Sequence, residues 1–151
     1  MIKSGEILIF LQVAEMVAKF SPDEETKIGA VLVNNDSNTI VASSYNDFIR
    51  DSTILKLPKS RPNKYEYIVH AEQNLIFNCL RYGISMKDCS LFCTLSPCLN
   101  CIRALWQCGF KKVIVKEVHK KHYSNDIKDI KINIKKSEGY YILEFEIKKD
   151  A

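Results

Sequence analysis

Apolar positions recur with two periods along the chain, and these predict a mixture of helices and strands. Over residues 6–20 the apolar side chains return every three or four positions, which is typical of a helix with one buried face, and Ser21-Pro22 ends it. A continuous apolar run, KIGAVLVNN, begins at Lys27, and the run TIVASSY covers 39–45. The turn at 35–38 between them predicts a hairpin of two strands.

The middle of the chain alternates helical and strand patterns. We expect helices over 70–82 and 98–108, and apolar runs predict strands over 89–95 and 111–118. Helices that alternate with strands buried on both faces are typical of an α/β protein. We therefore predict a three-layer α/β/α sandwich.

Residues 46–68 predict a long loop, because they contain two prolines and many charges. A loop of this length in a small domain is usually functional or disordered. We expect a functional loop, since it leads directly into the motif HAEQN at 70–74.

In the last third of the chain, the apolar residues fit both the helical period and the alternation of a strand. In residues 124–136 the isoleucines at positions 127, 130 and 134 have helical spacing, with acidic residues early and lysines late. The isoleucines at 130, 132 and 134 also alternate as they would in a strand. We expect a helix over 124–136, followed by a strand over 140–147.

Length and composition indicate which broad class of protein the chain belongs to. A chain of 151 residues with 46% hydrophobic and 26% charged residues is ordinary for a globular protein, and we predict one domain over residues 1–151. No apolar run reaches the roughly 18 residues that a membrane-spanning helix needs. The partly apolar start is interrupted by polar residues and no small-residue cleavage site follows, so we expect no signal peptide and a cytoplasmic protein.

Charge and cysteine content change this picture only slightly. A net charge of +4 permits an anionic ligand and does not indicate a nucleic-acid-binding surface. The chain has six cysteines and no secretion signal, so thiols or metal ligands are favoured over a disulfide framework.

Two short motifs carry the candidate chemistry. Cys98-x-x-Cys101 follows Pro97 at the expected start of a helix, where the helix dipole stabilises thiolates. His70 also opens a helix, so two helix starts can point at one place. His70, Cys98 and Cys101 would then supply three ligands, the number that a catalytic zinc uses while it keeps one position for water.

Glu72 adds a carboxylate to this site. If His70 lies at the helix cap, the side chains of His70 and Glu72 can both reach the metal centre. Glu72 would then be a proton shuttle rather than a ligand. A structural zinc is the alternative, and it needs a fourth protein ligand, for which Cys93 and His119 are the candidates.

The spacing H-x-E…P-C-x-x-C is the known signature of zinc-dependent nucleobase deaminases. Together with TKIGAVLV (26–33), SYN (44–46), KYEYIVHAEQNLI (64–76) and FCTLSPCLNCIRALWQCGFKKVIV (92–115), it makes this chain resemble the deoxycytidylate (dCMP) deaminase family of the zinc-dependent cytidine deaminase superfamily. These stretches sample residues 26–115.

This resemblance implies a cytidine deaminase-like fold, with a mixed five-stranded sheet and helices on both sides. It implies one zinc ion per subunit on His70, Cys98 and Cys101, with Glu72 as proton shuttle. The reaction would be hydrolysis of dCMP to dUMP with release of ammonia. Family members are commonly dimers or hexamers, so a homo-oligomer is expected.

The resemblance also suggests how the nucleotide is held. The backbone at Ala71 would bind the pyrimidine carbonyl and Asn46 the sugar, while His119 stands where the family often has a tyrosine near the pyrimidine. Lys27 and Lys120 are our candidates to neutralise the phosphate. Other cations could do the same: Arg61, Lys64, Lys116 and Lys121.

One departure bears on regulation. The family usually reads Gly-Tyr-Asn-Gly where this chain has Ser44-Tyr45-Asn46-Asp47, and Asp47 places a carboxylate where a deoxynucleoside triphosphate effector would approach. Control by such an effector therefore stays open. Two other functions also stay open: deamination of another substrate (a tRNA adenosine, a nucleoside or a free base) and a zinc domain without catalysis.

Overall fold

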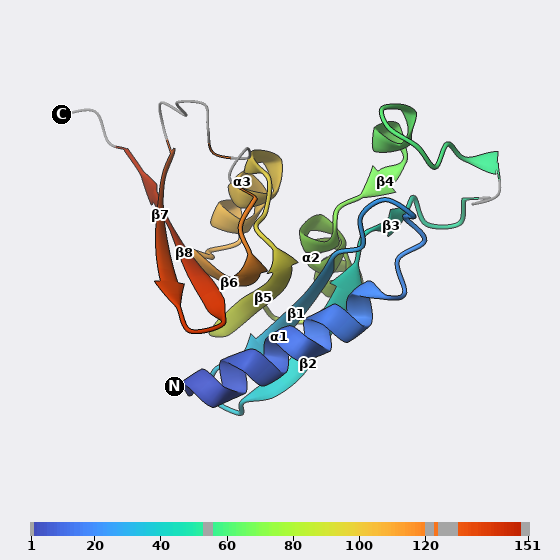
Figure 1. Cartoon of the computed structure of the whole chain (residues 1–151). Coiled ribbons are helices and arrows are strands. Elements are labelled where there is room, and N and C mark those ends of the chain that lie inside the picture. The colour runs from blue at the N-terminus through green and yellow to red at the C-terminus, as the bar shows by residue number, and fades with distance from the viewer. Residues whose placement is uncertain (1, 53–55, 120–122, 124–129, 149–151) are drawn as a thin grey trace.

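The computed structural model of the chain describes residues 2–52, 56–119, 123 and 130–148 (Figure 1). Its main element is a six-stranded mixed sheet with the order β2-β1-β5-β6-β8-β7. Only β5 and β6 pair in parallel among the neighbouring strands of this sheet. The bounds are β1 Gly29–Asn34, β2 Thr39–Tyr45, β5 Cys89–Leu95, β6 Lys112–Glu117, β7 Ile130–Ser137 and β8 Tyr140–Ile147.

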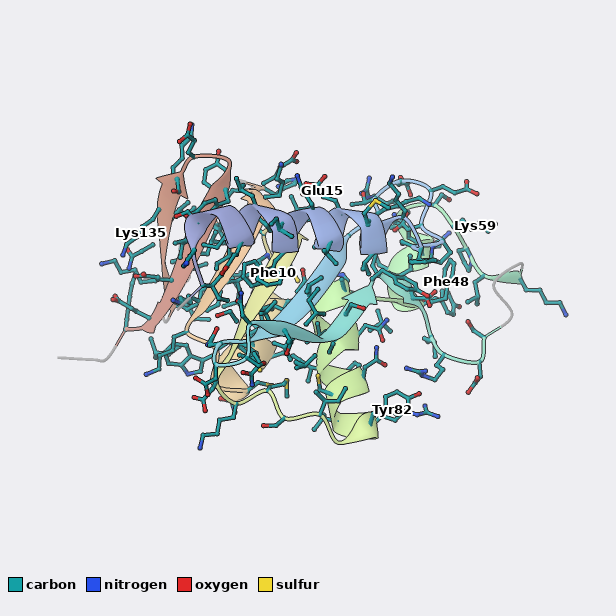
Figure 2. The ribbon with its side chains drawn as sticks, turned by 90° about the horizontal axis from the view of Figure 1, so that it is seen from below. Phe10, Glu15, Phe48, Lys59, Tyr82 and Lys135 are labelled. Carbon is teal, nitrogen blue, oxygen red and sulfur yellow. The ribbon has the colours of Figure 1, made fainter. Side chains whose placement is uncertain are left out.

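The sheet has helices on both faces, which confirms the predicted three-layer α/β architecture. Helix α1 (Ser4–Ala18) covers one face, and α2 (Ala71–Tyr82) and α3 (Leu99–Gln107) cover the other. Figure 2 shows α1 on one side of the sheet and α2, which ends at Tyr82, on the opposite side. Strand β1 alternates between the two layers, because Val31 and Val33 pack in the core beneath α1 while Ala30 and Leu32 belong to the core beneath α2 and α3.

Helix α1 lies very close to the start of β1. A Cβ atom at Gly29 would lie 2.0 Å from the carbonyl oxygen of Ala14, so only glycine fits here. This contact fixes where the loop between α1 and β1, residues 19–28, joins the sheet.

The predicted helix over 124–136 is wrong for residues 130–136, which form most of β7. Residues 124–129 lie outside the part of the chain that the structure describes. Strand β7 pairs antiparallel with β8 along its whole length, across a two-residue turn at Glu138 and Gly139. This pairing adds β7 as an edge strand beside β8, which explains why the sheet has six strands rather than the expected five.

The connection between β2 and α2 contains more structure than the predicted loop. Strands β3 (Asp47–Phe48) and β4 (Ile68–Val69) form a small two-stranded sheet, and a 3-10 helix, η2, covers Asn63–Glu66. Figure 1 shows β3 and β4 together at one side of the molecule, far from the β7–β8 hairpin. None of the described helices is long and apolar enough to cross a membrane.

Candidate active site

The metal-binding motifs lie at two helix starts, as the sequence predicts. His70 is the N-cap residue of α2, with φ −64° and ψ 150°, and Cys98 is the N-cap residue of α3, with φ −71° and ψ 170°. Neither side chain caps its own helix by a hydrogen bond, so each is available to point at a common centre. Cys101 lies in the first turn of α3 and is completely buried.

The three candidate ligand atoms form a small triangle. His70 Nδ1 lies 3.4 Å from the sulfur of Cys98 and 3.4 Å from the sulfur of Cys101, and the two sulfurs lie 3.5 Å apart. Zinc bonds of about 2.3 Å to sulfur and about 2.0 Å to nitrogen give tetrahedral edges of roughly 3.5–3.8 Å. The donor set and its spacing therefore fit one zinc ion, and within the described residues no other cluster of this kind occurs.

A hydrogen bond joins the two sulfurs. Their mutual hydrogen bond strongly lowers the pKa of Cys98 and raises the pKa of Cys101. The hydrogen bond to Cys98 also raises the pKa of His70, although burial opposes this. A bound cation would displace the proton of this hydrogen bond, because thiolates are the form that binds metal.

Glu72 lies beside this cluster and is 2% exposed. Burial raises the pKa of its carboxyl group, while hydrogen bonds from its own backbone N–H and from the Cys101 side chain favour the ionised form. Glu72 is not one of the three clustered ligands. Its contact with Cys101 places a carboxylate next to the metal centre, in the position expected of a group that moves protons there.

The cluster opens into a cavity of about 380 Å³, which we call the site cavity. This volume lies in the range of about 300–1,000 Å³ that small-molecule sites occupy. His70, Cys98 and Glu72 line the cavity together with residues from distant parts of the chain, among them Asp23, Thr26, Asn46, Arg61, Lys64 and His119. A larger cavity of about 940 Å³ lies between β2 and α2 and contains none of the metal cluster.

Part of the cavity wall is a buried ion pair. The Lys64 ammonium nitrogen lies 3.0 and 2.9 Å from the two carboxylate oxygens of Asp23, and the two side chains are 2% and 4% exposed. Lys64 also lies 3.2 Å from a carboxylate oxygen of Glu25. Asn46 Nδ2 donates to the carbonyl of Thr26 at 2.8 Å and to Asp23 at 3.4 Å. We call Asp23, Glu25, Asn46, Arg61 and Lys64 the wall network.

The predicted substrate-binding residues lie in different places. Asn46 and His119 line the site cavity, and the His119 backbone N–H donates to the Ser96 hydroxyl at 2.8 Å. Ala71 lies between His70 and Glu72, and its carbonyl accepts a hydrogen bond from Ser44. Lys27 is absent from the cavity lining and donates to the Ser21 carbonyl at 2.8 Å, while Lys120 lies outside the described residues.

Two contacts that shape the site gave no signal in the sequence. Asp23 reads as an ordinary turn residue after Ser21-Pro22, yet it is the buried partner of Lys64. Tyr123 donates its hydroxyl to the carbonyl of Pro97 at 2.6 Å and so holds the turn that precedes Cys98. Contacts of this kind join residues far apart in sequence, and no local pattern predicts them.

Comparisons with known proteins agree with this site. The family described as "Cytidine and deoxycytidylate deaminase zinc-binding region" matches residues 6–117. A probable deoxycytidylate deaminase of Caenorhabditis elegans is 38% identical over 108 residues, which are 69% of this chain and 53% of that protein. Human deoxycytidylate deaminase is 35% identical over 111 residues, covering 70% of this chain and 61% of that protein. The chain thus spans between half and two thirds of these relatives.

A solved structure gives the same result for the fold. The dCMP deaminase of cyanophage S-TIM5, in complex with dCMP and dUMP, matches with a TM-score of 0.68 and 27% identity over 80% of this chain and 87% of that one. The family match covers most of the chain and includes His70, Cys98 and Cys101. The protein therefore belongs to the family of the cytidine and deoxycytidylate deaminase zinc-binding region.

Proposed function

We propose that this protein is a zinc-dependent hydrolase that deaminates dCMP to dUMP and releases ammonia. The observation that carries the proposal is the meeting of His70, Cys98 and Cys101 with the buried Glu72 at one cavity. The names of the relatives and the dCMP and dUMP ligands of the cyanophage enzyme support this substrate.

In the proposed mechanism, His70, Cys98 and Cys101 hold the metal. Zinc, when bound, would activate a water molecule to attack the ring carbon that carries the amino group. Glu72 accepts one proton from that water and delivers it to the ring nitrogen, and it then moves the second proton, from the newly added hydroxyl group, to the leaving amino group. The burial of Glu72 keeps the carboxylate out of bulk solvent during both transfers.

Three residues in or next to the site cavity are assigned to the nucleotide. We assign Ala71, at the start of α2, to the pyrimidine carbonyl, because backbone N–H groups in the first turn of a helix have no partner within the helix. Asn46 is assigned to the sugar and His119 to the base, since both line the cavity. Lys27 and Lys120 stay predictions for the phosphate.

The test is ammonia release by the zinc-loaded protein across dCMP, deoxycytidine, cytosine, dCTP and an adenosine-bearing tRNA stem-loop. We expect turnover on dCMP. Glu72→Gln should lower kcat by about a hundredfold to ten-thousandfold, because it removes the proton shuttle, while zinc content and thermal stability are retained. Zinc loss in this variant would show that Glu72 supports the metal, and the shuttle assignment would then be wrong.

The substrate panel also separates the alternatives. Turnover only on the RNA, or only on the nucleoside or base, would keep the zinc chemistry and replace the substrate. A zinc domain without catalysis would require a fourth protein ligand. Within the described residues, neither Cys93, which is buried in the core, nor His119 joins the cluster.

Assembly, regulation and location are further parts of the proposal. A homo-oligomer, dimer or hexamer, is favoured by the exposure of Phe77, Leu80 and Tyr82 along α2, and light scattering with size-exclusion chromatography would measure it. Asp47 lines the larger cavity, so titration with dCTP and dTTP would test effector binding there. A cytoplasmic location stays a prediction.

A further inference from the structure

Two cations line the site cavity among the described residues, and they are held in different ways. Both carboxylate oxygens of Asp23 contact the Lys64 ammonium group, so its charge is matched at short range in a dry environment. Within the part of the chain that the structure describes, Arg61 has no buried carboxylate partner. Its side chain is 50% exposed, and it pairs with Glu25, which does not itself line the cavity.

The guanidinium of Arg61 still has donors to offer. Its side chain donates to Glu25 Oε2 at 3.3 Å and to the Thr26 hydroxyl at 2.9 Å, which uses two of the five N–H groups of a guanidinium. The Arg61 backbone N–H donates to the second oxygen of Glu25 at 3.1 Å. Glu25 thus occupies one guanidinium donor of a side chain that can bind phosphate with two parallel hydrogen bonds.

We propose that Arg61 binds the phosphate of the nucleotide substrate and that Glu25 competes with this phosphate for the guanidinium. The proposal rests on the proposed function and names the residue that makes a nucleotide a better substrate than a nucleoside. The base must lie near Glu72 and the metal cluster, so the phosphate needs a cation elsewhere in the same cavity. Lys64 is already neutralised by Asp23, which leaves Arg61 on the described part of the wall.

The first test compares two substrates that differ only in the phosphate. Arg61→Ala should raise KM for dCMP about ten- to a hundredfold with little change in kcat, because charge-assisted hydrogen bonds to the phosphate are lost. The kcat/KM for deoxycytidine should not change. An equal loss on both substrates, or no loss on dCMP, would overturn the phosphate assignment.

The second test asks whether KM for dCMP falls or rises when Glu25 loses its charge. Glu25→Gln removes the competing charge and its repulsion of the phosphate, so KM for dCMP should fall about two- to fivefold. A residue that merely held Arg61 in place would have the opposite effect when changed. A rise in KM in this variant would therefore overturn the competition.

The chain offers a matched control in the same two segments. Lys59 and Glu24 form an exposed pair at 3.8 Å, and neither residue lines the site cavity. Figure 2 shows Lys59 at the outer end of the molecule. Lys59→Ala and Glu24→Gln change the net charge by the same amounts as the test variants, and both should leave KM for dCMP unchanged. A shift as large as that of Arg61→Ala would mean that overall charge, and not Arg61, governs binding.

Binding measurements separate this proposal from the proposed reaction. Calorimetric titration of the zinc-loaded protein with dUMP and with inorganic phosphate needs no turnover. Suppose that the protein deaminates none of the substrates, while Arg61→Ala still raises the Kd of dUMP about ten- to a hundredfold. The phosphate site would then stand and the proposed reaction would be wrong. If dCMP is deaminated and Arg61→Ala changes neither KM nor the Kd of dUMP, the reaction stands and the phosphate site is wrong.

Discussion

The metal cluster and the wall network both contribute residues to the site cavity but are built in different ways. The cluster takes its ligands from two helix starts, and each motif spans only a few consecutive residues. The wall network joins the loop before β1, the end of β2 and the segment at η2, and its central pair is separated by 41 positions in sequence.

The difference lies in what holds each region together. The cluster brings three ligand atoms within 3.5 Å of one another, an arrangement that a cation stabilises. The wall network stabilises itself, because Lys64 and Asp23 neutralise each other in a buried position. We therefore expect changes in the two regions to have separate effects. Loss of a ligand in the cluster should remove the metal. Loss of Lys64 should reduce stability and loss of Arg61 should weaken nucleotide binding, while the metal stays bound.

The largest effect is expected from Cys98→Ala. Removal of one of three protein ligands should abolish stoichiometric zinc binding, because His70 and Cys101 alone do not complete the site. Deaminase activity should disappear with the metal. Elemental analysis of the purified protein measures the zinc content.

Cys108→Ala is the matched control, since Cys108 caps the other end of α3 and is a free thiol. This variant should keep its zinc. Stoichiometric zinc in Cys98→Ala would contradict the assignment of Cys98 as a ligand.

The second effect is a loss of stability in the wall network. Lys64→Met leaves Asp23 buried without its cation, which should lower the free energy of unfolding by about 3–5 kcal/mol. The zinc content should not change, since neither residue is a ligand. Denaturant unfolding followed by circular dichroism measures the difference.

The double variant Asp23→Asn/Lys64→Met sharpens this result. It removes both charges, so much of the stability lost in Lys64→Met should return. If the double variant is no more stable than Lys64→Met, the loss of stability comes from lost packing of the lysine side chain and not from an unpaired buried carboxylate. Loss of zinc in Lys64→Met would show that the two regions are not independent.

The same contrast explains how much of the site the sequence predicted. His70, Cys98 and Cys101 were placed correctly at one point because N-cap geometry depends on local sequence. Lys64 was considered only as one of several possible phosphate cations, since nothing in NKYE distinguishes a fully buried lysine from a surface one. Its partner Asp23 was missed, because the pairing depends on how two loops meet in the folded chain.

The fold shows the same limit. Strands β2, β5 and β8 have the predicted bounds, since each is an apolar run or an alternating run next to clear turn residues. Strand β7 was predicted as a helix because three isoleucines satisfy the helical period. The partner that decides its structure, β8, lies beyond it in the sequence, and the short turn at Glu138 and Gly139 was the signal that could have shown a hairpin.

The smallest expected effect is the response of the wall network to acid. Burial disfavours the charge on Asp23, but hydrogen bonds from Lys64 and from the backbone N–H groups of Glu25 and Thr26 outweigh it, so the pKa of Asp23 lies below its ordinary value of 3.8. The pKa of Glu25 is also lowered, chiefly by its hydrogen bond from Lys64. A carboxyl group whose pKa is lower in the folded state stabilises the fold above its unfolded pKa, and this stabilisation is lost as the pH falls through the folded pKa.

The free energy of unfolding of the unmodified protein should therefore fall as the pH drops below about 4. Asp23→Asn/Lys64→Met lacks this titration and should lose less stability over the same range. Acid also protonates the metal ligands, but that loss is common to both proteins, so the difference between their unfolding free energies isolates the wall network. If this difference stays constant from about pH 6 to about pH 3, the buried pair does not contribute to acid sensitivity, and the metal cluster alone would account for it.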